Sequence, residues 1–483
     1  MSTRHQLLVV GLLIGVAVVR VISTYNSTSQ AFDEPCHVAA AIELLDRHTY
    51  TLDPVHPPLS RIAIGVPLYL AGERYPDLTA DEAAHPNYNM VGNHILYDHG
   101  HYTRNLALAR SAMLPFLVFA SVLVFLWARR EFGNLAAILS VLLFTTTPIV
   151  LAFSSLAYSD LVTATTQLFA LFAFTIWLKT PSVRSTVILG IAIGLALMSK
   201  LTSFLFLPVA GLAILIPGFL GWASTAPTLK RHFRQFLASL VIAVLTLWSG
   251  YGFAVGHVRE EMNFSPEAMP SFQHFPNPVA KLGKAIVLKD PIIPGGELLR
   301  GLATGWALNQ TSPQGYLFGD IRPGGWWYFF LAGVMFKTPL PFLILCGLGM
   351  LSVGAHIRAR RLYSLTPAIF AIAIFIVTMP VKYNAGVRHV LVVFPLLALF
   401  AGQGCAYFWR SEGKVRAWSR SGLVILLLWQ GIESFRAQGD LISYFNELAG
   451  HDPSRIMVTG CDLDCGQDVF RLLRSSQLER FHM

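Results

Sequence analysis

The sequence predicts an all-α protein that crosses a membrane many times. Of its 483 residues, 54% are hydrophobic and only 13% are charged, whereas a soluble domain carries about 25% charged residues. The mean hydropathy is +0.54. Apolar runs of roughly 17 to 25 residues, long enough to cross a hydrocarbon core about 30 Å thick as helices, recur along the chain. These observations leave no room for a large soluble domain.

We expect about eleven transmembrane helices, joined by short basic connections on one side and long polar loops on the other. Clusters of Lys and Arg recur after every second apolar run, which is typical of cytoplasmic connections. The net charge of +9 therefore reflects topology rather than nucleic-acid binding, and the N-terminus lies inside and the C-terminus outside. The predicted spans are residues 7–24, 105–127, 135–153, 161–178, 187–199, 203–220, 236–254, 338–355, 364–381, 390–408 and 421–435.

The first apolar run, residues 7–22, follows a short basic segment as a signal peptide would. No small-residue cleavage pattern follows it, so we expect a retained anchor. The transmembrane domain then covers residues 1–435, with two long outer loops at 25–104 and 255–337, and residues 436–483 form a short outer tail. Long polar loops on one face of a scaffold commonly carry function. We therefore expect the site on the outer face of the membrane.

Two segments outside the spans have the pattern of helices that lie in the membrane interface. Residues 34–47 place apolar side chains at a spacing that gives one helical face. Residues 324–341 are rich in aromatic side chains, including Trp326 and Trp327, which favour headgroup depth. We expect both to be amphipathic juxtamembrane helices rather than further spans.

Asp33, Glu34 and His37 lie at the start of the first of these helices. In a structural interpretation, Asp33 is the N-cap and Glu34 offsets the helix dipole. In a functional one, Asp33 and His37 are four residues apart, so a carboxylate and an imidazole share a face and can bind a metal or share a proton. The two interpretations are compatible, because a carboxylate held at a fixed place also suits a general base.

His56 lies further along the same outer loop and is followed by two prolines. Proline fixes its own backbone and forces the preceding residue into an extended conformation. The imidazole of His56 is therefore presented in a fixed direction, on the same side of the membrane as His37. We consider both histidines candidate ligands of a divalent metal cation.

Several ionisable side chains are expected at outer depth, where the positive-inside bias disfavours cations. Anion binding is one reason for their presence, and snorkelling to the interface is another. With the carboxylates, they suit a reaction in which a hydroxyl attacks a carbon bonded to a lipid phosphate, because the hydroxyl needs a base and the departing phosphate needs neutralisation. The set comprises Arg104, Arg110, Asp160, Lys200, Lys337, Lys382, Arg388 and His389.

The five cysteines are too few for a disulfide framework. Cys346 and Cys405 fall within predicted spans and are expected to be packing residues. Cys36, Cys461 and Cys465 would lie outside, where oxidation is favoured. A bridge from Cys36 to the tail, or a metal loop around Cys461 and Cys465, would fit this placement.

The paired acids Asp33 and Glu34, the H-P-P-L element at 56–59, Asp160 after the third span and the K-T-P-L segment at 337–340 resemble glycosyltransferase family 39. That family has the GT-C membrane fold and includes protein O-mannosyltransferases and lipid A aminoarabinose transferases. The resemblance covers nearly the whole chain. It implies a polyprenyl-phosphate-linked sugar donor and inverting transfer on the non-cytoplasmic face of the plasma membrane, in a bacterium the inner membrane.

The resemblance also implies roles for single residues. Asp33 with Glu34 matches the catalytic acidic pair, and Asp160 matches a second acidic position. Lys200 and Arg388 resemble basic positions that hold the donor phosphate, and His56 falls at a position tied to metal binding in some members. The tail segment 444–473 is similar to a segment in a bacterial branch, but here cysteines replace a tryptophan and part of a polar pair.

Three functions stay open at this point. The first is a glycosyltransferase that moves a sugar from a polyprenyl-phosphate donor to a hydroxyl of a protein, lipid or glycan, with Asp33 as the base. The second is a transporter or lipid flippase, which would usually show internal repeats and ionisable groups near the membrane midplane. The third is a non-catalytic factor in envelope assembly, for which the altered tail leaves room.

Overall fold

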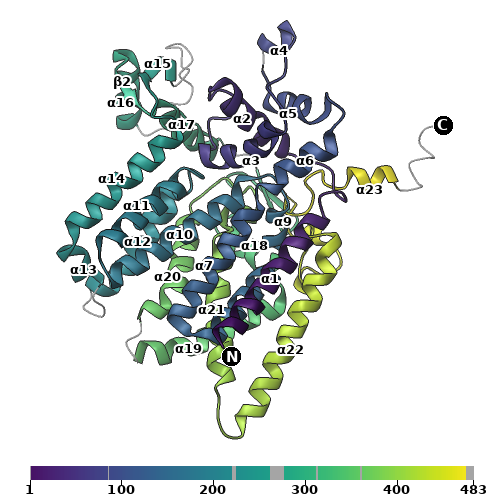
Figure 1. The fold of residues 1–483 in the computed structure, drawn as a ribbon, viewed down its shortest axis with the longest axis vertical. Helices are drawn as coiled ribbons and strands as arrows, with labels where there is room; N and C mark the ends of the chain where they lie inside the picture. The colour runs from purple at the N-terminus through teal and green to yellow at the C-terminus, as the bar shows by residue number, and fades with distance from the viewer. Residues whose placement is uncertain are drawn as a thin grey trace.

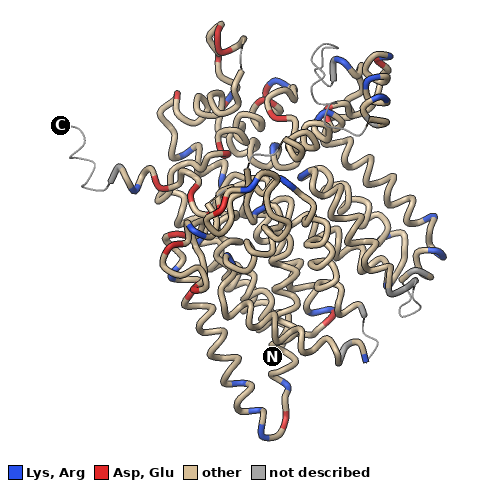
Figure 2. Tube along the Cα trace, turned by 180° about the vertical axis from the view of Figure 1, so that it is seen from behind, with Lys and Arg blue, Asp and Glu red and all other residues tan. Residues whose placement is uncertain are grey.

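A computed structural model describes residues 2–84, 86–219, 225–261, 277–311, 314–358, 362–458 and 460–474. These residues are mostly helical and include two small antiparallel sheets, in which β1 (Val255–His257) pairs with β2 (Ile292–Pro294) and β3 (Gly315–Leu317) with β4 (Asp320–Arg322). Figure 1 shows long helices packed side by side as a bundle, with the short helices of the outer loops gathered at one end. Most Asp and Glu residues lie at that end as well, as Figure 2 shows.

Each of the eleven predicted spans coincides with one or more helices of the bundle. They are α1 (Thr3–Ser23), α6 (Tyr102–Ser111) followed by α7 (Leu114–Phe132), α8 (Asn134–Thr145) with α9 (Pro148–Ser154), α10 (Ser159–Lys179), α11 (Val183–Leu197), α12 (Ser203–Phe219), α14 (Phe233–Gly250), α19 (Leu340–Arg358), α20 (Thr366–Thr378), α21 (Val393–Trp409) and α22 (Val415–Arg436). Short helices α13 (Thr225–Arg231) and η3 (Leu362–Leu365) lie in the connections.

Within the described ranges, four helices are long and apolar enough to cross a membrane, or up to six if each of two bent pairs is one span. The chain is thus a multi-pass membrane protein, while the full number of eleven spans stays a prediction. The first bent pair, α8 with α9, turns by 64°. Pro148 begins α9 there, and a proline disfavours the helical backbone conformation in the residue that precedes it.

The second bent pair joins α18 (Phe329–Lys337) to α19 and turns by 114°. Pro339 lies in the break and Leu340 begins the next helix. Residues 324–341 were expected in the membrane interface, but six of the nine residues of α18 are buried. Trp327 is exposed and Trp326 is partly buried, and the backbone N–H of Trp326 donates a hydrogen bond to the Asn384 side-chain oxygen at 2.6 Å. This segment packs into the protein on most of its faces.

The first outer loop folds into α2 (Glu34–Ile42), the turn η1 (Glu43–Arg47), α3 (Pro58–Leu70), α4 (Ala80–Ala84) and α5 (Tyr88–Tyr97). The prediction of an amphipathic surface helix was wrong, because all nine residues of α2 are buried. Its alanines allow close packing on several sides. A Cβ added to Gly92 of α5 would lie 2.0 Å from the Pro35 carbonyl oxygen, so this helix crossing requires glycine.

The second outer loop contributes β1, α15 (Val258–Glu261), α16 (Asn277–Lys289), β2, α17 (Gly296–Gln310), and then β3 and β4. Figure 1 places α15, α16 and β2 together above α14, at the end of the bundle that also carries the first loop. The N-terminal part of α17 meets the first loop, because the Arg300 guanidinium donates to the Tyr50 and Thr51 carbonyls at 3.4 and 3.2 Å. The two long loops therefore share one end of the molecule, while their place outside the membrane stays a prediction.

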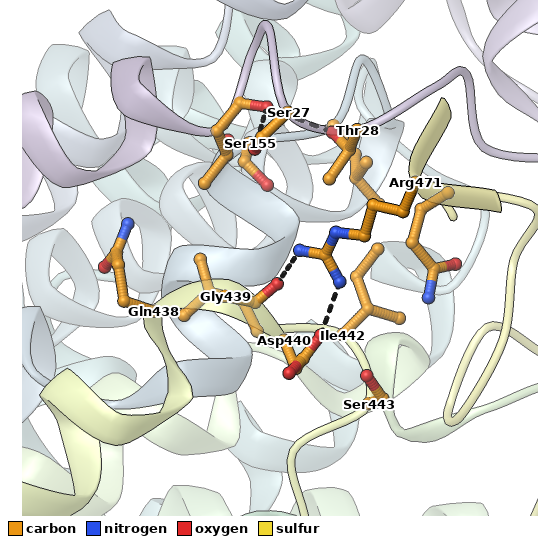
Figure 3. Close-up of a pocket in the computed structure, with 13 residues that line it drawn as sticks. Ser27, Thr28, Ser155, Gln438, Gly439, Asp440, Ile442, Ser443 and Arg471 are labelled. Carbon is orange, nitrogen blue, oxygen red and sulfur yellow. Dashed lines mark hydrogen bonds and ion pairs between the residues drawn. The ribbon is translucent and has the colours of Figure 1, made fainter. Parts of the chain in front are cut away.

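The described part of the tail contains η5 (Ala437–Gly439), η6 (Glu447–Ala449), η7 (Pro453–Arg455) and α23 (Val469–Arg474). It packs against both long loops rather than forming a separate unit. The Ser29 N–H donates to the Gln467 carbonyl at 2.9 Å, and the Phe318 N–H donates to the Ile456 carbonyl at 2.9 Å. Figure 3 shows Arg471 of α23 reaching back to Gly439 and Asp440, with 2.6 Å between its guanidinium and the Asp440 carboxylate.

Candidate active site

A cavity of about 1000 Å³ opens between the first outer loop, the segment before η4 (Val387–Val390) and the tail. This volume lies at the upper end of the range for ligand pockets, about 300–1,000 Å³. The charged side chains of its wall are Asp33, Arg388 and Asp464. Because the three segments are far apart in the sequence, only the folded chain brings these groups together.

Asp33 takes the N-cap position of α2, but its side chain accepts no capping hydrogen bond. The predicted capping role is wrong because the carboxylate turns to Arg388 instead, with 2.8 Å between Oδ2 and Nη1. Burial raises the pKa of the Asp33 carboxyl, but the charges of Arg388 and nearby groups lower it further, so the net pKa is below its usual value. The side chain is therefore an ionised carboxylate near neutral pH, facing the cavity.

Arg388 is held by its backbone turn and by the tail. A Cβ added to Gly386 (φ +96°) would lie 2.3 Å from the Gly460 carbonyl oxygen. The tail therefore packs so closely against this turn that only glycine fits at position 386. The Asp462 carboxylate accepts from the Val387 N–H at 3.0 Å. The guanidinium itself lies 5.1 Å from the centre of the Tyr158 ring, a distance at which a cation is attracted to an aromatic face.

Glu34 points away from the cavity and is fully buried with Arg110. The Arg110 Nε and Nη2 donate to the two carboxylate oxygens, each at 2.8 Å. The same carboxylate accepts from the N–H groups of Ala31 at 2.7 Å and Ala157 at 2.8 Å. This pair joins the first loop to the segment before α10. Neither residue lines the cavity.

Asp160 and Lys200 form a second buried ion pair, with 2.5 Å between Oδ1 and Nζ. Arg388 interacts electrostatically with Asp160 as well as with Asp33, and Asp160 also interacts with His389. The Nε2 atom of His389 is buried and has no hydrogen-bond partner among the described residues. Asp160 therefore links the Asp33–Arg388 pair and the Lys200 ammonium in one electrostatic network.

His37, Asp53 and His56 form the one group within the described chain that has metal-ligand character, with donor atoms within 4.8 Å of one another. The His56 Nδ1 lies 2.7 Å from the Asp53 Oδ2. Burial and the neighbouring His56 lower the pKa of His37 to about 3, so its imidazole is neutral. Two imidazoles and a carboxylate are a donor set that zinc and similar divalent ions accept, and the predicted histidines thus form a candidate metal site.

Three predicted cationic residues make other contacts and do not line the cavity. The Arg104 guanidinium lies 2.7 Å from the Glu73 carboxylate, and Arg110 holds Glu34. Lys337 is fully buried and donates to the Ile442 carbonyl at 2.6 Å and to the Asp462 carbonyl. Their predicted contact with a donor phosphate therefore has no support from the geometry.

Two residues of the site escaped the sequence analysis. Asp53 lies three residues before His56, and that spacing next to the prolines was an available signal. Tyr158 has no such signal, because its contacts with the site, to Asp33, His37 and Arg388, are all distant in sequence. Its hydroxyl accepts from the Asp33 N–H at 3.0 Å, and its ring lies 5.4 Å from that of His37, edge to face.

The cysteine predictions need correction. Cys461 and Cys465 form a disulfide, while Cys36 is a free, buried thiol. The expected bridge from Cys36 to the tail and the metal loop in the tail are therefore both wrong. The disulfide lies in the cavity wall, and its Cys465 sulfur lies 3.2 Å from the Tyr158 hydroxyl. Cys346 and Cys405 are free, as expected of packing residues.

Comparison with protein families gives a match over residues 107–249 to the model described as dolichyl-phosphate-mannose-protein mannosyltransferase. The matched range includes Asp160 and Lys200. This match confirms the predicted resemblance and the predicted class of enzyme, a membrane glycosyltransferase that uses polyprenyl-phosphate-linked sugars. No curated protein sequence matches this chain.

Solved structures share the fold. ArnT from Cupriavidus metallidurans bound to undecaprenyl phosphate is 14% identical, with a TM-score of 0.56 over 89% of this chain and 71% of that chain. The archaeal oligosaccharyltransferase AglB from Archaeoglobus fulgidus, in complex with an inhibitory peptide and a dolichol-phosphate, is 13% identical, with a TM-score of 0.54 over 93% of this chain and 58% of that chain.

An oligosaccharyltransferase from Archaeoglobus fulgidus in complex with Zn and sulfate is also similar. It is 14% identical, with a TM-score of 0.51 over 88% of this chain and 53% of that chain. At such identities the likeness shows the fold alone, which agrees with the predicted GT-C arrangement. The chain spans 71% of the length of the ArnT chain and little more than half of the oligosaccharyltransferase chains.

Proposed function

We propose that this chain is an inverting glycosyltransferase that moves a sugar from a polyprenyl-phosphate donor to an acceptor hydroxyl on the outer face of the plasma membrane, in a bacterium the inner membrane. The observation that carries the proposal is the Asp33–Arg388 ion pair in the wall of a large cavity. It offers a base and a phosphate-binding cation side by side. The outer face is inferred from the charge of the connections and from the loops that form the cavity.

In the proposed reaction the acceptor hydroxyl donates a hydrogen bond to the Asp33 carboxylate. Its oxygen attacks the sugar carbon on the side opposite the phosphate, and the bond between that carbon and the phosphate oxygen breaks. Asp33 takes the hydroxyl proton, and polyprenyl phosphate leaves as an anion. A single displacement of this kind inverts the configuration at the sugar carbon, and it needs no covalent enzyme intermediate.

The leaving phosphate needs positive charge, because it departs without a proton. Arg388 is the cation that reaches the cavity wall. Its five N–H donors form a fork that suits phosphate, so it can bind the donor while still facing Asp33. Lys200 and His389 do not line the cavity, and we assign them, with Asp160, to holding Arg388 in place rather than to direct phosphate contact.

The fixed charges of this cluster nearly cancel, since Asp33 faces Arg388 and Asp160 faces Lys200. An arriving lipid phosphate would therefore meet little net positive charge. A divalent cation held by His37, Asp53 and His56 would add that charge next to Asp33. The neutral imidazole of His37 and the ionised Asp53 fit this role, and the ring contact from His37 to Tyr158 links the candidate metal site to the base.

The similar structures support a lipid-phosphate donor. One contains undecaprenyl phosphate and another a dolichol-phosphate. We carry this ligand class to the present chain because Arg388 and the cavity offer a matching cationic wall. Glu34 was predicted as part of the catalytic pair, and we now assign it a positioning role through Arg110.

The direct test is mass spectrometry of envelope glycoconjugates from cells with and without the active protein. We expect a sugar mass to disappear from one class of molecule when the gene is deleted, and to return with the wild-type chain but not with Asp33→Asn. A Glu412→Gln variant, changed at an exposed carboxylate in the connection between α21 and α22, should restore it. If deletion removes no glycoconjugate, the non-catalytic assembly role would gain support.

A further inference from the structure

We infer that the acceptor bound by the cavity is a neutral glycan, so that the sugar is added to a sugar hydroxyl. This inference rests on the proposed function and names the acceptor class for the same site. Its basis is a wall of carboxamide and aromatic side chains arranged along one face of a helix, beside Asp33.

The cavity wall is rich in uncharged polar groups. Five of its twenty residues carry carboxamides, whereas three carry a charge. A carboxamide both donates and accepts hydrogen bonds, as a sugar hydroxyl does. The carboxamides are Gln30, Asn89, Asn93, Gln314 and Asn384.

Helix α5 presents three of the wall residues as one stripe. Asn89, Asn93 and Tyr97 follow one another at intervals of four residues, which places them on the same helical face. All three line the cavity. Because α5 is fixed against α2 by the close contact at Gly92, this stripe has a set position relative to Asp33, which precedes α2.

Gln30, which contacts this stripe, has an oxygen without a partner among the described residues. Gln30 Nε2 donates to Asn93 Oδ1 at 2.9 Å, while Gln30 Oε1 is buried and has no hydrogen-bond partner among the described residues. Asn89 Oδ1 accepts from the Cys36 thiol at 2.8 Å. A buried polar atom without a partner is unfavourable, so a ligand that donates a hydrogen bond to Gln30 would be stabilised here.

An aromatic platform lies at the end of the stripe. The Tyr97 ring stacks on Tyr102 with centroids 4.3 Å apart, and Phe470 of the tail packs edge-on against Tyr102 at 5.5 Å. Tyr97 is 48% exposed, so one ring face stays available. Sugar rings carry C–H groups on one face and hydroxyls at their edge, and an aromatic face next to carboxamides complements both.

The charge of the wall argues against an anionic acceptor. Asp33 and Asp464 are negative and Arg388 is positive. The proposed donor phosphate would already form an ion pair with Arg388. A phosphorylated lipid headgroup would thus meet repulsion. An extended peptide usually adds to a strand edge, and none of the wall residues lies in the described strands. A neutral polyhydroxyl acceptor fits the remaining groups best.

The test uses the full chain in phospholipid nanodiscs and two measurements. The first is saturation-transfer NMR with maltotriose, cellotriose and chitotriose as probes. The second is release of polyprenyl phosphate from lipid-linked sugar in the presence of these glycans, of a Ser/Thr-rich peptide, or of vesicles that contain a phosphorylated lipid. Tyr97→Ala is the test variant. Tyr88→Ala is the control, because Tyr88 lies on the same helix, is 42% exposed and does not line the cavity.

We expect at least one glycan to bind and to accelerate release of polyprenyl phosphate. Tyr97→Ala should raise the glycan KM about tenfold, and Tyr88→Ala should match the wild type in glycan KM and in slow release to water. Release stimulated by the peptide or the phosphorylated lipid, and by no glycan, would overturn the acceptor class and leave the proposed function standing.

If no acceptor stimulates release and none occurs to water, the proposed function fails and the binding measurement decides the inference alone. Glycan binding that Tyr97→Ala weakens and Tyr88→Ala preserves would then support a glycan site. Absence of binding to all three probes would overturn it.

Discussion

At the scale of single residues, two adjacent carboxylates have different surroundings because they face different arginines. Asp33 points into the cavity and meets Arg388, whereas Glu34 points into the protein and meets Arg110. Both oxygens of Glu34 are occupied by buried donors, so it has no access to a substrate. Asp33 keeps partial exposure, 27% of its side chain, and can therefore exchange its partner for an acceptor hydroxyl.

We predict that Glu34→Gln acts on stability. Removing one partner of a buried ion pair leaves the other charge uncompensated, which costs about 3–5 kcal/mol. The thermal midpoint in detergent should fall strongly, while the exposed control Glu412→Gln should unfold like the wild type. A Glu34→Gln protein with an unchanged midpoint and no sugar transfer would instead make Glu34 a catalytic residue.

The candidate metal site gives a second prediction at this scale. His56→Ala removes one of three donor groups, so divalent metal retained by the purified protein should fall, as measured by elemental analysis. A chelator should slow sugar transfer by the wild type, and added divalent metal should restore it. His451→Ala, at an exposed histidine in the tail, serves as control. Full sugar transfer by metal-free protein would show that the reaction does not need a metal at this site.

At the scale of elements, the tail acts as a clamp on two segments that carry site residues. The Phe32 N–H, next to Asp33, donates to the Cys465 carbonyl of the tail at 2.7 Å. The Asp462 carboxylate of the tail accepts a hydrogen bond from the Val387 N–H of η4. The buried Lys337 of α18 donates to the Asp462 carbonyl from the other side. The position of Arg388 relative to Asp33 therefore depends on this tail segment.

Loss of the disulfide should loosen the clamp. Cross-linking residues this close in sequence stabilises a segment by about 2 kcal/mol in the chain-entropy model. We expect Cys461→Ser to speed hydrogen exchange in residues 460–474 and 29–33 and to slow sugar transfer. A reductant should have the same effect on the wild type and none on the variant. Equal effects of the reductant on both proteins would contradict this assignment.

Helix α5 is joined to α4 by a histidine with two carboxylate partners. His94 Nδ1 lies 2.7 Å from Asp98 Oδ2, and Nε2 lies 3.2 Å from Glu82 Oε1. Hydrogen bonds to Asp98 and Glu82 raise the pKa of His94 above its usual value. The stabilisation is therefore fully present below the unfolded pKa of about 6.5 and is lost as pH rises through the folded pKa.

This linkage predicts that α4 and α5 open more readily at alkaline pH. Hydrogen exchange in residues 80–84 and 88–97, corrected for the intrinsic pH effect, should be slower at about pH 5.5 than at about pH 8.5. His94→Gln should remove the difference. A variant that keeps the wild-type pH dependence would show that another group controls these helices.

At the scale of the whole molecule, the bundle was predictable because its signals are local. The length and apolarity of each run give a helix wherever one was expected, and the loops gather at one end of the bundle. Asp33 was also found locally, from an acidic pair after an apolar run. Its partner Arg388 lies 355 residues away, and nothing in the sequence shows which cation of the predicted set would reach it.

The errors have the same origin. The apolar spacing of residues 34–47 fits a surface helix, but alanines on the remaining faces let other helices cover α2 completely. Arg110 and Lys337 were predicted to bind phosphate because the sequence does not show their buried partners, which come from distant segments. The pairing of Cys461 with Cys465 depends on the tail loop, and the role of Tyr158 depends on packing between α2, η4 and the tail.

The central claim is that Asp33 is the base of a sugar-transfer site. The most direct measurement is release of polyprenyl phosphate from lipid-linked sugar by purified, full-length Asp33→Asn protein in nanodiscs, beside the wild type. Because an amide cannot accept the hydroxyl proton, we predict release at least about 100-fold slower, in a protein that remains folded. Release at the wild-type rate would contradict the account.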